Sequence, residues 1–192
     1  MKPSSTSWAV YVAAASIGLM ALKASGVEYK SMDAAKSIVA FSYKQMGVGM
    51  EGKFKKFSTQ LSFDPAKPAT AKTHIEIELA SVDTGSSEAD QEVIGKAWFN
   101  TAAFPKATFV SSQIKQTGAN QFEVLGKLSI KGQTKDMSFP LKYVAQSNAG
   151  VFSGSFVLRR ADFNIGEGMW AKFDIVANEI PVTFQFTALT SK

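Results

Sequence analysis

Few residues of the types that catalyse reactions or bind metals occur in this sequence. His74 is the single histidine and no cysteine is present, which excludes thiol chemistry, disulfides and multi-histidine or thiolate metal sites. A Ser-His-Asp triad would need His74, and a pair of catalytic acids would need Glu76 and Glu78. All three alternate with Ile75 and Ile77, so they share the polar face of a predicted strand. We interpret them as surface groups and predict no catalytic residue and no metal site.

The composition indicates one domain with a sizeable core. The 192 residues are 45% hydrophobic and include 15 Phe, and aromatic residues favour strands with large buried surfaces. The formal charge is +5, but basic residues occur singly or in pairs such as Lys55-Lys56. Nucleic-acid binding needs a basic patch, so no nucleic acid is expected as a partner.

Residues 1–25 have the pattern of a secretory signal peptide. Lys2 supplies positive charge, residues 8–22 form an apolar run, and small residues follow at 24–26. The run is shorter than the roughly 20 residues of a membrane-spanning helix, although an uncleaved N-terminal anchor is the alternative. We expect cleavage within 24–26, a mature domain over residues 26–192, and a periplasmic or secreted protein.

The rest of the chain alternates between apolar and polar residues with the period of half-buried strands. Turn residues such as Lys131-Gly132-Gln133 separate the alternating runs. A capping serine and early acids at 86–96 predict one short helix. The expected strands cover residues 37–44, 50–63, 70–82, 107–116, 121–131, 134–145, 150–160 and 173–188.

Short hairpins make neighbouring strands antiparallel in sequence order, and closing them into a barrel removes exposed edges. We predict an all-β fold: an eight-stranded antiparallel up-and-down barrel, as in lipocalins, with the short helix between strands three and four. The interior of such a barrel holds one small ligand. A two-sheet sandwich is the alternative, disfavoured because sandwiches need crossing connections.

Several short motifs follow one another along the chain. They are MEGKFKKF at 50–57, SVDT at 81–84, WFN at 98–100 with FP at 104–105 and ATF at 107–109, GKLSIKGQTK at 126–135, and RRADFNIG at 159–166. Taken in this order, they resemble the YceI-like family over about residues 29–188. The chain departs from that family at 90–94 (DQEVI), where many members carry a histidine, and at Asn164, where glycine is common.

The resemblance implies a lipocalin-like barrel that binds isoprenoid chains and is exported in most bacterial members. It implies non-enzymatic binding, transport or sequestration of a long apolar isoprenoid-type lipid or quinone, with no other cofactor. Transient membrane contact and a dimer stay open. The alternatives are an envelope stress-related or partner-binding protein whose barrel is filled by its own side chains, and an enzyme acting on an isoprenoid lipid.

The predicted ligand contacts are apolar side chains that alternation turns into the lumen, together with loop aromatics at its rim. Gly126 and Gly154 share the inward parity, where a missing side chain would either leave room or allow the barrel wall to bend. Arg159, Arg160 and Asp162 either face a polar head group at the mouth or form a surface ion pair. The predicted contacts are Phe41, Phe54, Ile75, Ile77, Trp98, Phe99, Phe109, Phe122, Val124, Leu128, Phe139, Phe156, Phe163, Trp170 and Phe184. The loop aromatics among them, Trp98, Phe99, Phe163 and Trp170, either line the rim or plug one end as core.

Overall fold

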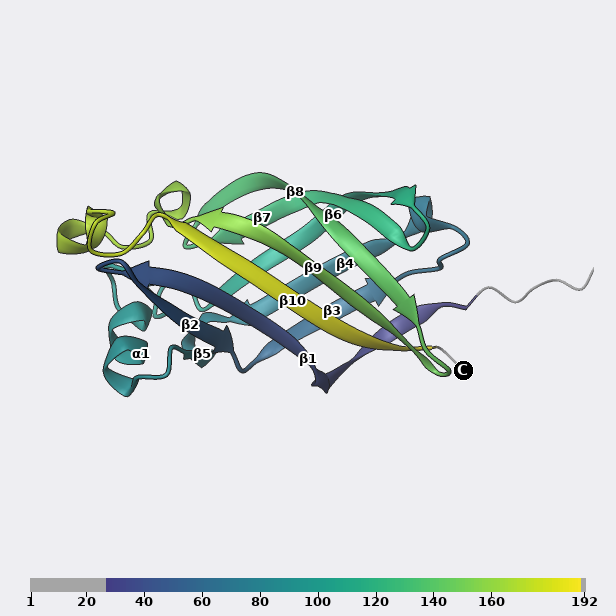
Figure 1. Ribbon diagram of the computed structural model, residues 1–192, viewed down its shortest axis with the longest axis horizontal. Helices are drawn as coiled ribbons and strands as arrows, with labels where there is room; N and C mark the ends of the chain where they lie inside the picture. The colour runs from purple at the N-terminus through teal and green to yellow at the C-terminus, as the bar shows by residue number, and fades with distance from the viewer. Residues whose placement is uncertain (1–26, 191–192) are drawn as a thin grey trace, which may run out of the picture.

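A single antiparallel sheet curls into a barrel in the computed structural model, which describes residues 27–190 (Figure 1). The predicted signal peptide at 1–25 lies outside the described residues. Neighbours in the sheet follow the order β3-β4-β6-β7-β8-β9-β10-β1-β2-β5. The elements are β1 (Tyr29–Gln45), β2 (Val48–Phe54), β3 (Phe57–Ser62), β4 (Lys72–Glu78), β5 (Val82–Asp83), α1 (Ser87–Ile94), β6 (Lys106–Gly118), β7 (Gln121–Ile130), β8 (Gln133–Ala145), β9 (Ala149–Arg159) and β10 (Glu179–Thr190), with short 3-10 helices at Pro68–Thr70, Leu79–Ser81, Arg160–Phe163 and Gly168–Ala171.

The sheet has 10 strands and not eight, because two expected strands are broken. The run predicted at 50–63 turns a corner at residues 55–56, so that β2 pairs with β1 while β3 pairs with β4. The run predicted at 70–82 is interrupted by the 3-10 helix Leu79–Ser81, after which β5 pairs with β2. A strand that changes neighbours must bend, and alternation alone does not reveal the bend. The antiparallel barrel and its strand order are confirmed.

The predicted helix is confirmed as α1, between β5 and β6. The Ser86 side chain accepts a hydrogen bond from the backbone nitrogen of Ala89, and Glu88 and Asp90 lie in the first turn. A side-chain oxygen at this position satisfies a free backbone donor, and acidic residues there complement the helix dipole.

The first and last strands differ in length from the prediction. β1 begins at Tyr29 and not at 37, because residues up to Asp33 pair with the end of β10; a bulge between Asp33 and Ile38 then shifts the register. β10 begins at Glu179 and not at 173, because residues 173–178 belong to a loop at the barrel end. Bulges and loops obscure the two-residue period that the prediction used.

The corner between β2 and β3 leaves a gap in the hydrogen bonding of the barrel wall. β1 is paired with β2 only as far as Val39, and beyond it β3 runs beside β1. Within the described chain, the backbones of β1 and residues 55–63 are joined only by the reciprocal hydrogen bonds of Tyr29, at the start of β1, and Phe63, the residue after β3, with N–O distances of 3.0 and 3.3 Å. Residues 30–38 and 55–62 are therefore unpaired with each other, and we call this stretch the β1–β3 seam.

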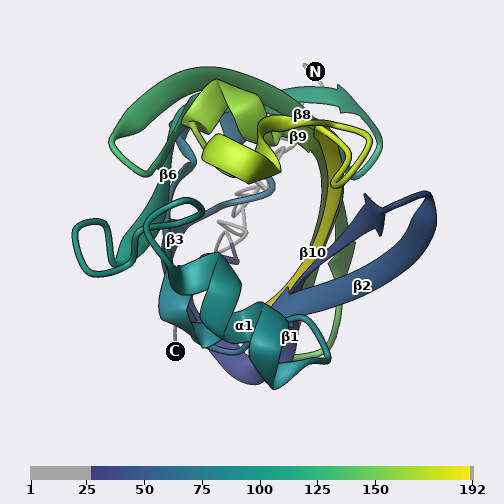
Figure 2. The same cartoon turned by 90° about the vertical axis from the view of Figure 1, so that its left-hand side faces the viewer.

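Aromatic rings close the barrel at the end near Tyr29. The Phe63 ring lies 5.3 Å from that of Phe122 and 5.0 Å from that of Phe152, centroid to centroid. The hydroxyl groups of Tyr29 and Tyr143 are 2.7 Å apart, and burial together with this hydrogen bond raises the pKa of Tyr143. At the opposite end, α1 and residues 160–178 lie across the opening (Figure 2).

Candidate binding site in the barrel lumen

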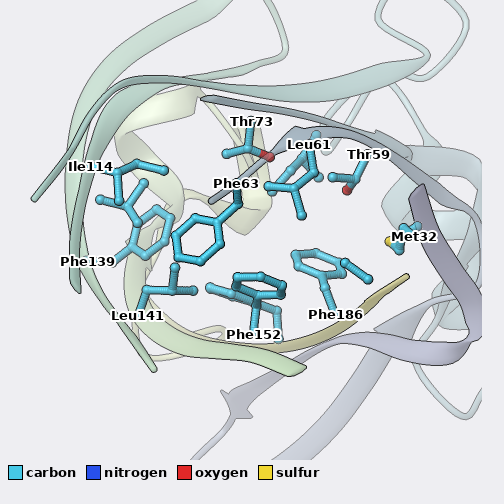
Figure 3. A pocket seen from close by; sticks show the side chains of 14 residues that line it. Met32, Thr59, Leu61, Phe63, Thr73, Ile114, Phe139, Leu141, Phe152 and Phe186 are labelled. Carbon is cyan, nitrogen blue, oxygen red and sulfur yellow. The ribbon is translucent and has the colours of Figure 1, made fainter. Parts of the chain in front are cut away.

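A narrow cavity of about 40 Å³ lies inside the barrel (Figure 3). Its wall is contributed by β1, β3, β4 and the strands β6 to β10, together with Phe63 just after β3, so most of the sheet positions it. Apart from Thr59 and Thr73, the side chains are apolar. The lining residues are Met32, Thr59, Leu61, Phe63, Thr73, Ile75, Ile114, Val124, Phe139, Leu141, Phe152, Phe184, Phe186 and Ala188.

Some of the predicted contacts line this cavity, and the others pack around it. Ile75, Val124, Phe139 and Phe184 belong to the lining. The others lie in the core or against it, apart from Phe41, which is half-buried beside Phe54. Buried in the core are Trp98, Phe109, Phe122, Leu128 and Phe163; packed against it are Phe54, Ile77, Phe99, Phe156 and Trp170.

The prediction missed much of the lining. Leu141, Phe152 and Phe186 share the inward parity of their strands, so alternation identifies them although they were not chosen as contacts. Met32 and Thr59 carried no such signal, because β1 was expected to start later and because Thr59 is polar. The remaining missed residues are Leu61, Phe63, Thr73, Ile114 and Ala188.

Gly126 and Gly154 lie beside inward-facing rings but do not leave free room. A Cβ on Gly126 would lie 2.5 Å from the Phe109 ring, and one on Gly154 would lie 2.5 Å from the Phe184 ring. The expectation of open space is therefore wrong, because an aromatic ring from the neighbouring strand covers each glycine.

Arg160 organises the loop that covers the other end of the barrel. Its side chain is 1% exposed, and it donates hydrogen bonds to backbone carbonyl oxygens only. Burial lowers the pKa of this guanidinium. The acceptors are the carbonyls of Ile165, Gly166, Trp170, Lys172, Val176 and Ala177.

The head-group expectation for the basic pair is not supported. Arg160 is buried among loop carbonyls, and the Arg159 side chain points to Glu179 at 3.8 Å across exposed surface. Asp162 is exposed. The surface-pair alternative is thus partly right, but its acidic partner is Glu179 and not Asp162.

The loop aromatics form a plug. The rings of Trp98 and Trp170 are 5.5 Å apart, and the Arg160 guanidinium lies 5.6 Å from the Trp98 ring centroid. The Trp170 Nε1 donates to Glu92 Oε1 of α1 at 2.8 Å. Because Trp98 and Phe163 are buried, the plug alternative fits better than an open rim.

The titratable residues considered first lie on the outer face of the barrel. His74 Nε2 is 3.9 Å from Glu76 Oε1, and Lys106 Nζ is 2.8 Å from Glu76 Oε2. The hydrogen bond from Lys106 lowers the pKa of Glu76. Across residues 27–190, no three His, Cys, Asp or Glu side chains are grouped as metal ligands would be. The helices within that range are too short or too polar to cross a bilayer.

The fold and cavity define a small antiparallel barrel built around an apolar, aromatic-lined interior. The chain belongs to the YceI-like family, since the YceI-like domain matches residues 31–188. The resemblance drawn from the sequence motifs is thereby confirmed.

Curated relatives and solved structures are consistent with this family. UPF0312 proteins of Yersinia pestis and Azotobacter vinelandii are 34% and 32% identical over 137 residues, 67% of this chain and 70% and 71% of theirs. Burkholderia cenocepacia BcnA is 41% identical with a TM-score of 0.80, over 82% of this chain and 99% of that one. A polyisoprenoid binding domain from Saccharophagus degradans, 17% identical, has a TM-score of 0.69 over 85% of this chain and 99% of its own. This last likeness shows the fold alone.

Proposed function

We propose that this protein binds a long apolar isoprenoid-type lipid or quinone inside the barrel and carries or sequesters it without chemical change. The observation that carries the proposal is the lumen cavity, whose wall is apolar except for Thr59 and Thr73. The description of the Saccharophagus degradans domain as polyisoprenoid binding supports it. Each methylene transferred from water to such a wall contributes about 0.8 kcal/mol.

Binding requires the lumen to widen. The cavity holds about 40 Å³, whereas pockets for drug-sized ligands measure about 300–1,000 Å³. Phe139, Phe184 and Phe186 project into this space, and their rings have no hydrogen bonds that would fix them. We infer that these rings turn aside as a chain enters and then contact it.

We propose that the protein acts in the periplasm or after secretion. The support is the pattern of residues 1–25. Amino-terminal sequencing of protein from the cell envelope tests this proposal: a mature chain that starts at residues 25–27 is expected. A full-length chain held in the membrane fraction would contradict it.

Native mass spectrometry of protein isolated from its own envelope, followed by titration of delipidated protein with geranylgeraniol, tests the binding function. We expect a retained long-chain lipid and saturable one-to-one binding. Ala188→Leu, at a fully buried lining position, should weaken this binding. Thr183→Leu, at an exposed position of the same strand, should not. Absence of both native lipid and geranylgeraniol binding would overturn the proposal.

A barrel filled by its own side chains, serving to bind a protein partner, is the second candidate. It is favoured by the small cavity and by exposed apolar side chains at the α1 end, including Met46 (73% exposed) and Met169 (76%). The β1–β2 turn and the 160–178 loop are joined there, since Met46 N donates to Ile175 O at 2.8 Å. A lipid-free protein in the mass spectrum that resists loading would support this candidate.

A further inference from the structure

Among the fully buried side-chain nitrogen and oxygen atoms of the cavity lining, one has no hydrogen-bond partner. Thr59 Oγ1 is buried and has no hydrogen-bond partner among the described residues. It lies on β3 among the lining side chains, and Figure 3 shows its oxygen directed towards the cavity. An unpartnered buried hydroxyl is destabilising, so this position is unfavourable unless a partner arrives.

The unpartnered oxygen lies at the β1–β3 seam. Thr59 belongs to β3 and Met32 to β1, and both line the cavity where the two strands have no mutual hydrogen bonds. The seam also borders an outer groove of about 320 Å³. Ala34 of β1 and Phe57 and Ser58 of β3 line that groove. Apolar cavity and polar groove therefore meet on the two sides of one seam.

The charges of this groove are already balanced. Lys106 pairs with Glu76 at 2.8 Å and Lys56 pairs with Glu78 at 3.7 Å, and all four residues line the groove. Lys55, which also lines it, reaches Asp83 at 3.8 Å. Because each lysine has a carboxylate, the groove offers a polar environment without excess positive charge, which suits a neutral head group better than an anionic one.

Resting on the proposed function, we propose that the ligand is a chain ending in a neutral hydrogen-bonding oxygen, which pairs with Thr59 Oγ1 at the seam. The apolar chain then occupies the cavity, and any larger head group extends towards the outer groove. The hydroxyl of Thr59 donates to a carbonyl oxygen or accepts from an alcohol. The other orphaned side-chain atom in the described chain, Trp98 Nε1, is not in the cavity lining.

The test compares three ligands of one chain length: geranylgeraniol, a quinone with a C20 prenyl chain, and the C20 isoprenoid hydrocarbon. Delipidated wild-type protein should bind the alcohol or the quinone about three- to tenfold more tightly than the hydrocarbon. Thr59→Val, which keeps the shape but removes the hydroxyl, should abolish this preference. Thr59→Ser should retain it, and Thr183→Val, on the exposed face of β10, should leave it unchanged.

The three ligands and the Thr59 variants distinguish the possible outcomes. The oxygenated ligand whose affinity falls in Thr59→Val identifies the head group as alcohol or carbonyl. A wild-type protein that binds all three ligands equally, or a Thr59→Val variant that keeps the preference, overturns the Thr59 pairing but leaves the lumen function intact. Failure to bind any of the three overturns the proposed function itself.

The stability of the variant gives a readout that does not depend on ligand. Thr59→Val should raise the melting temperature of delipidated protein, because it removes an unpartnered buried hydroxyl. A clear fall in the melting temperature would mean that Thr59 hydrogen-bonds within the protein, which overturns the proposal.

Discussion

At the scale of single residues, the inner wall of this barrel shows how glycine and aromatic residues are used together. Phe41 covers Gly52, Phe109 covers Gly126, and the rings of Tyr29 and Tyr143 cover Gly150. In each case the ring takes the place where a Cβ would be. Glycine in a strand weakens it, and the packed ring offsets part of that loss.

Gly126→Ala should destabilise the protein by about 1–3 kcal/mol, because the new methyl group overlaps the Phe109 ring and the Val110 carbonyl oxygen. Gly49→Ala is the matched control, since nothing lies within 4 Å of its added Cβ. Urea denaturation measures both. Equal stability of the two variants would show that the Phe109 ring shifts freely and that the glycine is not required for packing.

At the scale of elements, one buried arginine holds the 160–178 loop across the barrel end. Arg160→Lys should lower the free energy of unfolding by about 2–4 kcal/mol, because an ammonium group lacks the planar fork that reaches several carbonyls. Arg159→Lys should change it by less than about 1 kcal/mol, because its ion pair is exposed. Faster amide exchange within 164–177 in Arg160→Lys, with β6–β8 unchanged, would confirm the local role.

The β1–β3 seam makes a separate prediction at this scale. We expect the ligand to enter and leave between β1 and β3. A short cleavable cross-linker that joins Ala34→Cys to Ser58→Cys should therefore slow loading and release of geranylgeraniol by at least about tenfold, because it prevents the two strands from separating. The chain has no natural cysteine, so the reagent reacts only there. Cleaving the linker should restore the rates.

A control pair lies on the opposite wall. Lys127→Cys and Asp136→Cys are register partners on β7 and β8, where the backbone is fully hydrogen-bonded. The same cross-link there should leave exchange unchanged. If both cross-links slow exchange equally, or neither does, the ligand enters elsewhere, and the barrel end covered by residues 160–178 becomes the next place to test.

At the scale of the whole molecule, ligand binding and folding are linked. Geranylgeraniol at one hundred times its dissociation constant should stabilise the protein by about 2.7 kcal/mol. Affinity should rise along the C10, C15 and C20 prenols and then level off once the lumen is filled. Calorimetric titration and thermal unfolding measure the two effects. Affinity that rises without levelling would indicate adsorption to a surface and not a bounded lumen.

The sequence by itself determined the antiparallel strand order, the helix at α1 and the family. These follow from signals within a few residues: two-residue alternation, a capping serine, and short motifs in a fixed order. Alternation also placed Phe139 and Phe184 on the inner face, because the face of a strand residue depends only on its parity.

Only the tertiary structure determined where the barrel wall lacks backbone hydrogen bonds, which side chains fill the lumen and which charged groups are buried. The seam arises because β2 pairs with β1 while β3 pairs with β4. Phe109 covers Gly126 because the neighbouring strands β6 and β7 bring the two residues into contact. No sequence pattern around Arg160 or Thr59 indicates its role. Arg160 donates hydrogen bonds to carbonyl oxygens along the 160–178 loop, whereas Thr59 Oγ1 has no hydrogen-bond partner within residues 27–190. Such outcomes depend on which distant residues come together when the barrel closes, and a local pattern does not contain that information.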